Sequence, residues 1–309
     1  MRTCERLLEE HFQKERNNNN NNDLSLIMLP EMCFTGYTFH DKDDVSEFVE
    51  FDQDDEVQET KDFLIKLANK YDCLVCAGYV RGCLKNDDAG NDNGDNDNND
   101  EFLFYNAMQI VNKREVLARV NKNHLYILDE TWADESSEGF VSRNLVIRGK
   151  SCDGSINEFR VKTQFGICMD INPYKFQKPW KDYEFANAIL KSKSSLTLFS
   201  SAWTNAHPDD SNKDVIPKEE ETWNYWFSRL APIFEKENDE NDDDDDVVTN
   251  RAFVFANRLG VEEGIHFVGS SIAFEHSSKN SENIAIKGSL TNNKEGVLVT
   301  EVWCEGVLT

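Results

Sequence analysis

Basic residues, long apolar runs and paired metal-binding cysteines are all scarce in this sequence. Its 309 residues include 33 Lys and Arg against 58 Asp and Glu, a formal net charge of −25. Binding to nucleic acid or to an anionic membrane surface needs a basic patch, so this balance argues against both partners. No run reaches the ~20 apolar residues of a membrane span, and the charged residues 1–16 lack the apolar core of a secretory signal. We therefore expect a cytoplasmic protein.

The eight cysteines are too scattered to form a disulfide framework in a chain of this length. Most lie in apolar, strand-like segments, which suits a reducing compartment. Cys73, Cys76 and Cys83 could form a zinc knuckle, but a second ligand pair at zinc spacing is missing. We interpret these three cysteines as packing residues and expect no metal.

A single domain spanning residues 1–309 is the simplest organisation. The length allows one large α/β domain or two ordinary ones, and no internal repeat divides the chain. Acidic stretches at 87–101 and 235–246 cannot form a core, so we interpret them as solvated insertions.

The spacing of apolar residues predicts mixed strands and helices. In the first half we expect a helix at 5–15, a strand at 24–29, a helix at 57–71, a strand at 73–80 and a hairpin of strands 102–111 and 115–120. In the second half we expect strands at 145–148, 158–167, 196–200, 252–256, 272–274 and 297–302, and helices at 180–190 and 219–234. Helices that cover sheets in this way indicate a layered α/β sandwich.

Cys168 stands where an apolar strand turns towards a helix. Such a turn lifts a side chain above the sheet edge and directs main-chain N–H groups at the space in front of it. Cys168 is therefore a candidate nucleophile, and the N–H of Met169 is a candidate donor to an oxyanion. The alternative is a buried cysteine that only ends a strand.

Glu31 and Lys122 also follow predicted strands. Glu31 comes directly after an apolar Leu-Ile-Met-Leu-Pro run, and Lys122 follows the strand at 115–120. Alone, either residue is more typical of a cap or a surface charge. Pro30-Glu31, then Lys122 shortly before a His-Leu pair, then Cys168 followed by an acid together resemble the nitrilase or carbon-nitrogen hydrolase superfamily. Segments 200–203, 257–260 and 269–271 also resemble family landmarks, so the resemblance spans nearly the whole chain.

The resemblance implies a four-layer αββα sandwich of the nitrilase type, with Cys168 as nucleophile, Glu31 as general base and Lys122 as oxyanion stabiliser. The chemistry is independently reasonable, because a carboxylate can accept a thiol proton and an ammonium can compensate a developing negative charge. No cofactor is implied. Members of the family often carry a second Glu near the Lys; we assign this role to Glu130, with Glu135 and Glu138 as rivals.

Segments 29–40 and 166–176 resemble the branch of the superfamily that converts N-terminal Asn or Gln of proteins to Asp or Glu in the N-degron pathway. Many other branches have Arg where this chain has Asn172. The expected partners are protein or peptide N-termini that bear Asn or Gln, bound by a monomer or homodimer. A site that selects an N-terminal residue needs a carboxylate for its ammonium. Asp170 is the candidate, although it could instead brace the turn, and the acids at 129–130 could share or replace it.

One departure from the family concerns the first strand. Family members open with a strand before the first helix, whereas this sequence starts almost directly in the helix, so we expect a sandwich that lacks that strand. Two other functions remain open. A small-molecule carbon-nitrogen hydrolase, such as an ω-amidase or carbamoylase, would use the same three residues. A non-catalytic interaction protein is favoured by the missing strand and disfavoured by the intact Glu-Lys-Cys set.

Overall fold

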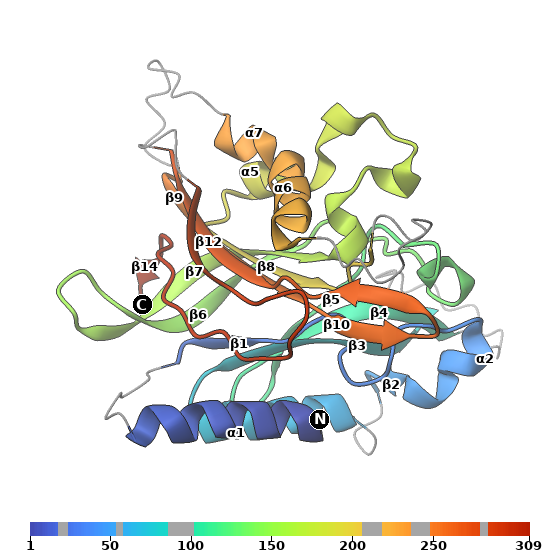
Figure 1. Cartoon of the computed structure of the whole chain (residues 1–309), viewed down its shortest axis with the longest axis horizontal. Coiled ribbons are helices and arrows are strands. Elements are labelled where there is room, and N and C mark those ends of the chain that lie inside the picture. Colours follow the sequence, from blue (N-terminus) through green and yellow to red (C-terminus); the bar gives the residue numbers. More distant parts are fainter. Residues whose placement is uncertain (18–23, 54–57, 86–101, 206–217, 236–247, 279–283) are drawn as a thin grey trace, which may run out of the picture.

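The computed structural model describes residues 1–17, 24–53, 58–85, 102–205, 218–235, 248–278 and 284–309. The predicted insertion at 87–101 lies outside these ranges, as does the insertion at 235–246 apart from Glu235. Two β-sheets face each other, and helices cover the outer face of each sheet (Figure 1). The four-layer sandwich expected from the sequence is therefore confirmed.

The first sheet has the strand order β1-β3-β4-β5, and β2 also pairs with β3. β3, β4 and β5 are antiparallel neighbours, whereas β1 and β2 run parallel to β3. The bounds are Leu26–Met28 for β1, Glu50–Phe51 for β2, Leu74–Leu84 for β3, Phe102–Val111 for β4 and Val116–Asn121 for β5.

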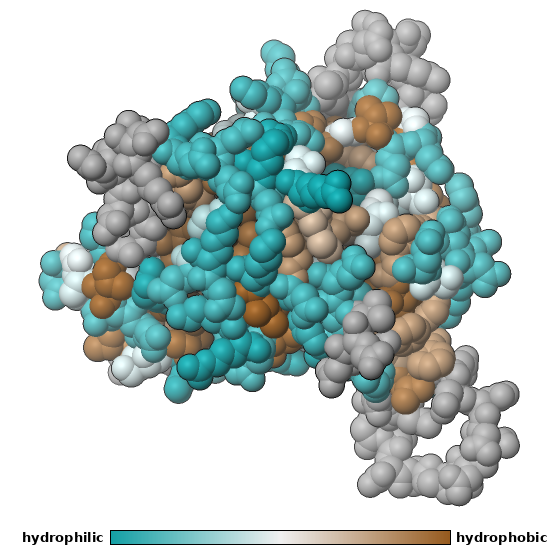
Figure 2. Space-filling view, turned by 90° about the horizontal axis from the view of Figure 1, so that it is seen from below, coloured by the Kyte–Doolittle hydropathy of each residue, from teal (hydrophilic) through white to brown (hydrophobic). Residues whose placement is uncertain are grey.

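Helices α1 (Arg2–Asn17) and α3 (Glu59–Tyr71) cover the outer face of the first sheet. Their apolar stripes bury Leu8, Leu64 and Leu67 in one cluster with residues of β1 and β3. The opposite helix faces carry charged side chains, so this side of the molecule is mostly hydrophilic (Figure 2). This is the pattern of an amphipathic surface helix.

The second sheet has the order β13-β12-β9-β8-β7-β14, and β6 also pairs with β7. β7, β8 and β9 are parallel, and the other pairs are antiparallel. The bounds are Ser142–Lys150 (β6), Ile156–Ile167 (β7), Leu196–Ser201 (β8), Asn250–Asn257 (β9), Ile272–Ser277 (β12), Ile284–Ser289 (β13) and Val307–Leu308 (β14). Its outer face is covered by α5 (Glu184–Ser192), α6 (Glu219–Arg229) and α7 (Ala231–Phe234).

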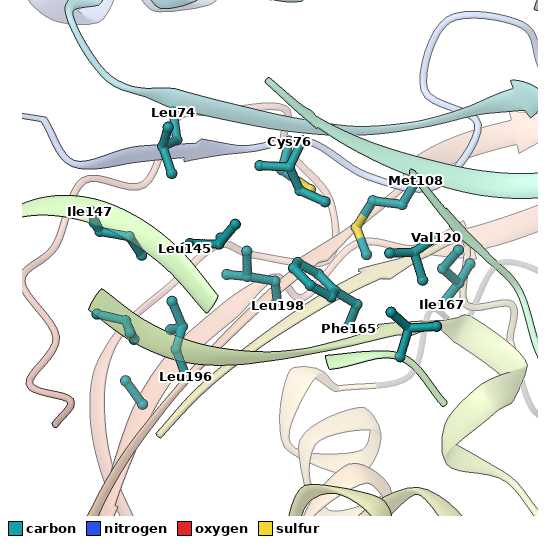
Figure 3. Close-up of a cluster of buried hydrophobic side chains, with 14 of the residues drawn as sticks. Leu74, Cys76, Met108, Val120, Leu145, Ile147, Phe165, Ile167, Leu196 and Leu198 are labelled. Atoms are coloured by element: carbon teal, nitrogen blue, oxygen red, sulfur yellow. The ribbon is translucent and has the colours of Figure 1, made fainter. Parts of the chain in front are cut away.

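The main core lies between the two sheets. Cys76 and Met108 from the first sheet meet Phe165, Ile167 and Leu198 from the second (Figure 3). Burial of each large apolar side chain contributes roughly 1.5–3 kcal/mol, so this layer fixes the sheets against each other. The strand ends above this layer are therefore held in a defined geometry.

Short elements occupy the connections. They are α2 (Lys42–Val45), the 3-10 turns η1 (Ser46–Phe48), η2 (Asp129–Thr131), η3 (Cys168–Ile171), η4 (Tyr174–Phe176) and η5 (Trp180–Asp182), and the antiparallel pair β10 (Leu259–Glu262) and β11 (Ile265–Val268).

Three predicted elements differ from the structure. The helix at 219–234 divides at Leu230, just before Pro232, which lacks the N–H that a continuous helix needs. The helix at 180–190 begins as the turn η5, and α5 starts only after Tyr183, whose φ is +43°. The strand at 297–302 is wrong, because this segment enters no ladder with another described strand.

The edge of the first sheet at β1 is open. In the described residues no strand precedes α1, which begins at Arg2. A cavity of about 2150 Å³ lies between this edge, α1 and the second sheet, and residues 297–304 line it. The segment at 297–302 thus lines a space in which, among the described strands, it pairs with none and β1 pairs only with β3.

The cysteines at 73, 76 and 83 lie in three different hydrophobic clusters. They alternate along the β3 region, so neighbouring thiols point to opposite faces of the sheet. This separation fits packing residues. No helix in the described ranges is long and apolar enough to span a membrane.

Candidate active site

The three predicted catalytic residues come together above the core. Glu31 follows β1, Lys122 follows β5 and Cys168 follows β7. All three side chains are buried; Glu31 and Lys122 have 0% exposure and Cys168 has 7%. The two facing sheets therefore deliver groups from residues 31, 122 and 168 to one enclosed place.

Glu31 is held by donors on both carboxylate oxygens. Oε1 accepts hydrogen bonds from Lys122 Nζ and Asn106 Nδ2, both at 2.7 Å, and Oε2 accepts from the main-chain N–H of Ala202 at 2.6 Å. Gly78 allows this arrangement, since a Cβ there would lie 2.6 Å from the Cα of Glu31. Burial raises the pKa of Glu31 against the opposing charge of Lys122, which makes the carboxylate a stronger base.

Lys122 lies between two carboxylates. Its Nζ donates to Glu31 Oε1 at 2.7 Å and to Asp129 Oδ2 at 2.6 Å, and it lies 3.3 Å from the Tyr37 hydroxyl. Burial acts to lower the pKa of Lys122, but the charges of Asp129 and Glu31 outweigh it and hold that pKa above its usual value. Lys122 therefore remains an ammonium at neutral pH.

Cys168 opens the 3-10 turn η3 with a φ of +45°, a left-handed conformation that is uncommon for a residue with a side chain. The turn from strand to helix that we expect from the sequence is present, and we call it the elbow. Burial raises the pKa of the Cys168 thiol, the Glu31 charge raises it further and Lys122 opposes this. Cys168 thus rests as a thiol and needs a base in order to attack.

The second carboxylate that accepts from Lys122, besides Glu31, is that of Asp129, so we propose Asp129 for the role that the sequence analysis assigned to Glu130. Asp129 is 1% exposed, and its Oδ1 also accepts from Asn106 Nδ2 at 3.0 Å. The turn η2 directs the next side chain outwards, and the Glu130 carboxylate lies 3.7 Å from Lys175 at the surface.

The two rivals of Glu130 are also on the surface. Glu135 accepts from the Tyr174 hydroxyl at 2.7 Å, and Glu138 lies 3.8 Å from Arg143. Asp129 lies four residues after the Asn123-His124-Leu125 segment, which directly follows Lys122, and this short separation could have identified it. The family resemblance indicates a Glu for this role and therefore misses an Asp.

Asp170 is buried and braces the site through its carboxylate. Its Oδ1 accepts from the main-chain N–H groups of Asn123 at 2.9 Å and His124 at 2.7 Å, and its Oδ2 accepts from Ile167 N at 2.8 Å. These bonds tie the segment after Lys122 to the elbow. This geometry favours the alternative role of bracing the turn, and the predicted ammonium-binding role of Asp170 stays a prediction.

Met169 stands second in η3, and its side chain is buried. The first N–H groups of a helical turn have no acceptor within that turn. The Met169 N–H therefore remains our proposed second donor to an oxyanion, beside Lys122.

Buried polar groups near these residues without a hydrogen-bond partner in the described part of the chain include Asn106 Oδ1 and the indole N–H of Trp132. The Ser201 hydroxyl, directly before Ala202, is also buried, and its hydrogen bonding to the Cys168 thiol acts to lower the pKa of that thiol. Trp132 packs in one cluster with Tyr37 and Ala202. Buried unsatisfied polar groups are rare, and ones next to reactive residues are available to a ligand.

Asn172 follows directly after the turn that Cys168 opens. Its Oδ1 accepts from the Tyr225 hydroxyl at 2.5 Å, and its main-chain oxygen lies 3.0 Å from His124 Nδ1. The side chain is thus fixed by helix α6. No group of His, Cys, Asp and Glu in the described ranges could hold a metal ion.

Comparison with known proteins gives consistent matches. A model of the carbon-nitrogen hydrolase family matches residues 4–173, which include Glu31, Lys122 and Cys168. The chain is 26% identical to the protein N-terminal amidase of Schizosaccharomyces pombe over 308 residues, covering 96% of this chain and 91% of that protein. It is 27% identical to the protein N-terminal amidase of Saccharomyces cerevisiae over 188 residues, covering 59% of this chain and 37% of that protein. The fold is similar to a crystal structure of N-terminal amidase with an Asn-Glu-Ala peptide, with a TM-score of 0.71 and 18% identity over 98% of this chain and 94% of that one.

Proposed function

Because the chain belongs to the carbon-nitrogen hydrolase family, we propose that it hydrolyses the side-chain amide of an N-terminal Asn or Gln in proteins and peptides, giving Asp or Glu and ammonia. The observation that carries this proposal is the buried contact of Glu31 with Lys122 beside Cys168. The two yeast relatives bear the name of this activity, and the one from Schizosaccharomyces pombe aligns with nearly the whole chain.

Glu31 starts the reaction by removing the proton from the Cys168 thiol as sulfur attacks the amide carbon. The pKa values of Glu31 and of the Cys168 thiol are both raised, so the proton should move to Glu31 during the attack and not before it. The carbonyl oxygen becomes negative as the carbon becomes tetrahedral. Lys122 and the Met169 N–H stabilise this oxygen.

Collapse of the tetrahedral species breaks the carbon–nitrogen bond. The leaving nitrogen takes the proton held by Glu31 and departs as ammonia, which leaves a thioester on Cys168. Glu31 then removes a proton from water, which attacks the thioester carbon. The carboxylic acid product leaves, and the thiol regains its proton, so the cycle consumes one water and one amide.

Asp129 keeps Lys122 charged throughout this cycle. When Glu31 holds a proton it no longer compensates the ammonium, and a buried ammonium without a counter-charge is costly. Asp129 Oδ2, at 2.6 Å, supplies that charge. Asn106 donates to both carboxylates and fixes the distance between them.

The proposal also places the enzyme in the cytoplasm, acting on N-termini as a monomer or homodimer. All eight cysteines are free thiols, which fits a reducing compartment. The net charge of −25 argues against nucleic acid as a partner.

Ammonia release from a matched set of peptides tests the proposal. Peptides that begin with Asn or Gln should release ammonia, whereas the same peptides acetylated at the N-terminus, or with Asn moved to the second position, should not. Comparable turnover of the acetylated peptide, or turnover only of free small amides, would reject the N-terminal activity and support a small-molecule amidase. No ammonia from any substrate would support a non-catalytic role.

A further inference from the structure

The segment that follows Glu31 has no helix or strand, yet it joins Glu31 to a second group of the site, Tyr37. We call residues 32–38 the base loop. It turns at Met32, with a φ of +43°, and at Gly36, with a φ of +93°, before it delivers the Tyr37 hydroxyl to within 3.3 Å of Lys122 Nζ. Without contacts from elsewhere, such a loop would leave the positions of Glu31 and Tyr37 poorly defined.

Glu262, at the end of β10, supplies those contacts at the far end of the base loop. Its Oε1 accepts from Tyr37 N at 2.7 Å, from Thr38 N at 2.9 Å and from Thr38 Oγ1 at 2.6 Å. Gly36 makes this approach possible, since a Cβ there would lie 3.0 Å from the same oxygen. These three donors hold the pKa of Glu262 below its usual value although burial opposes this, so the side chain is a carboxylate at neutral pH.

Arg258 extends the contact to the near end of the base loop. Its Nη2 donates to Glu262 Oε2 at 2.6 Å, and its Nη1 donates to the main-chain oxygen of Met32 at 3.0 Å. Its guanidinium lies 5.0 Å from the ring centre of Phe267, which meets the Tyr37 ring edge-on at 5.7 Å. The Arg258–Glu262 ion pair therefore holds both ends of the base loop, which follows the proposed catalytic base Glu31.

The same region also fixes the other side of Glu31. Arg258 N donates to Ser201 O at 2.9 Å, and Val268 N donates to Trp203 O at 3.0 Å. Between these two points lies Ala202, whose N–H donates to Glu31 Oε2. The β10–β11 hairpin thus holds both the base loop and the main chain that orients the carboxylate.

We propose that Arg258 and Glu262 are positioning residues, which set the place of Glu31 and Tyr37 relative to Lys122 and Cys168. The pair is partly exposed, with 21% and 24% of its side chains accessible, so its contribution to stability is small. Its contribution to rate is larger, because a displacement of about 1 Å in a catalytic group can cost about 100-fold in turnover. This inference rests on the proposed function only in its use of turnover as a readout.

Substitution of Glu262 tests the inference. Glu262→Ala should lower kcat about 10- to 100-fold and change KM much less. Glu262→Gln keeps one acceptor oxygen for the base loop and should recover part of kcat. Because both side chains act as a unit, Arg258→Met should cause a similar loss, and the double variant should lose no more than the worse single one.

Glu275 on β12 provides a matched control. It is also a partly buried carboxylate, with 20% of its side chain accessible. Like Glu262, it accepts a hydrogen bond from a main-chain N–H, that of Trp303, and forms an ion pair, here with Lys287 at 3.5 Å. Glu275→Ala should leave kcat unchanged. Equal losses in Glu262→Ala and Glu275→Ala, or additive losses in the double variant, would overturn the positioning role.

A second readout separates this inference from the proposed function. Glu31 influences the Cys168 thiol, so moving Glu31 should change how the alkylation rate of Cys168 depends on pH, whatever the substrate is. Glu262→Ala should shift that profile and Glu275→Ala should not. If no peptide is hydrolysed but the profile shifts, the function fails and the positioning role stands; an unchanged profile in a folded Glu262→Ala protein overturns the role.

Discussion

Lys122 Nζ lies 2.7 Å from Glu31 Oε1, and both side chains are completely buried. The two residues stand 91 positions apart in the sequence and leave different strands of the same sheet. A buried pair of this kind stabilises a protein little compared with apolar packing, because desolvation of both charges is costly. The pair lies beside the Cys168 thiol, which follows a strand of the facing sheet, and this position fits a role in catalysis.

Lys122→Met should reduce kcat at least ~10²-fold and alter KM far less, because the ammonium acts on charge that exists only in the transition state. It should also destabilise the fold by about 3–5 kcal/mol, since two buried carboxylates lose their partner. Steady-state kinetics and urea unfolding measure the two effects. An effect confined to KM would move Lys122 from the oxyanion to substrate binding.

Asp129→Asn and Glu130→Gln form a matched pair of neighbouring substitutions. Asp129→Asn removes the charge that keeps Lys122 protonated when Glu31 is neutral, so kcat should fall by about 10-fold or more. Glu130→Gln should leave kcat unchanged, because that carboxylate is at the surface. Reversed effects, measured by ammonia release at saturating peptide, would return the role to Glu130.

Asp170→Asn should lower kcat and stability without changing substrate selection. The two carboxylate oxygens together accept three main-chain N–H groups, and Asn replaces one of these oxygens by a donor, so the link between the segment after Lys122 and the turn at Cys168 should weaken. If Asp170 only braces the turn, discrimination between free and acetylated N-termini should survive, since its carboxylate is then used by main-chain donors. Loss of discrimination with an intact kcat would show that Asp170 binds the ammonium after all.

The alkylation of Cys168 should depend on pH in the way of a buried thiol. Its pKa is raised, so the reactive thiolate is scarce at neutral pH, and the rate should continue to increase above about pH 8.5, the usual cysteine value. Mass spectrometry after treatment with iodoacetamide measures this, with exposed Cys152 in the same sample as reference. A rate for Cys168 that is already constant at neutral pH would contradict the resting thiol.

Local sequence patterns predicted most of the fold, and they failed where tertiary contacts decide. The apolar residues of 73–80 and 158–167 mark β3 and β7, because β3 and the C-terminal part of β7 are buried on both faces. Residues 297–302 have an equally good strand pattern, yet a strand also needs a hydrogen-bonding neighbour, and here they face the cavity beside β1. The strands β10 and β11 have four residues each, and only Phe267 and Val268 among them are buried, so their short pattern gave little signal.

The candidate site divides in the same way. Glu31, Lys122 and Cys168 each follow a strand. The short motifs around them, and the order of these motifs along the chain, could be recognised in the sequence. The choice between Asp129 and Glu130 depends on the direction of a single 3-10 turn, which no spacing rule encodes. The role of Glu262 depends on contacts with residues more than 220 positions away.

In the proposed reaction, Cys168 attacks the side-chain amide of an N-terminal Asn or Gln and forms a thioester. Rapid acid quenching of the enzyme during turnover of an Asn-initiated peptide, followed by peptide mapping with mass spectrometry, detects this intermediate. We expect an adduct on Cys168 whose mass is that of the peptide minus ammonia, and no adduct from the acetylated peptide. Ammonia release with the adduct on another cysteine, or continued turnover in Cys168→Ala, would exclude Cys168 as the nucleophile.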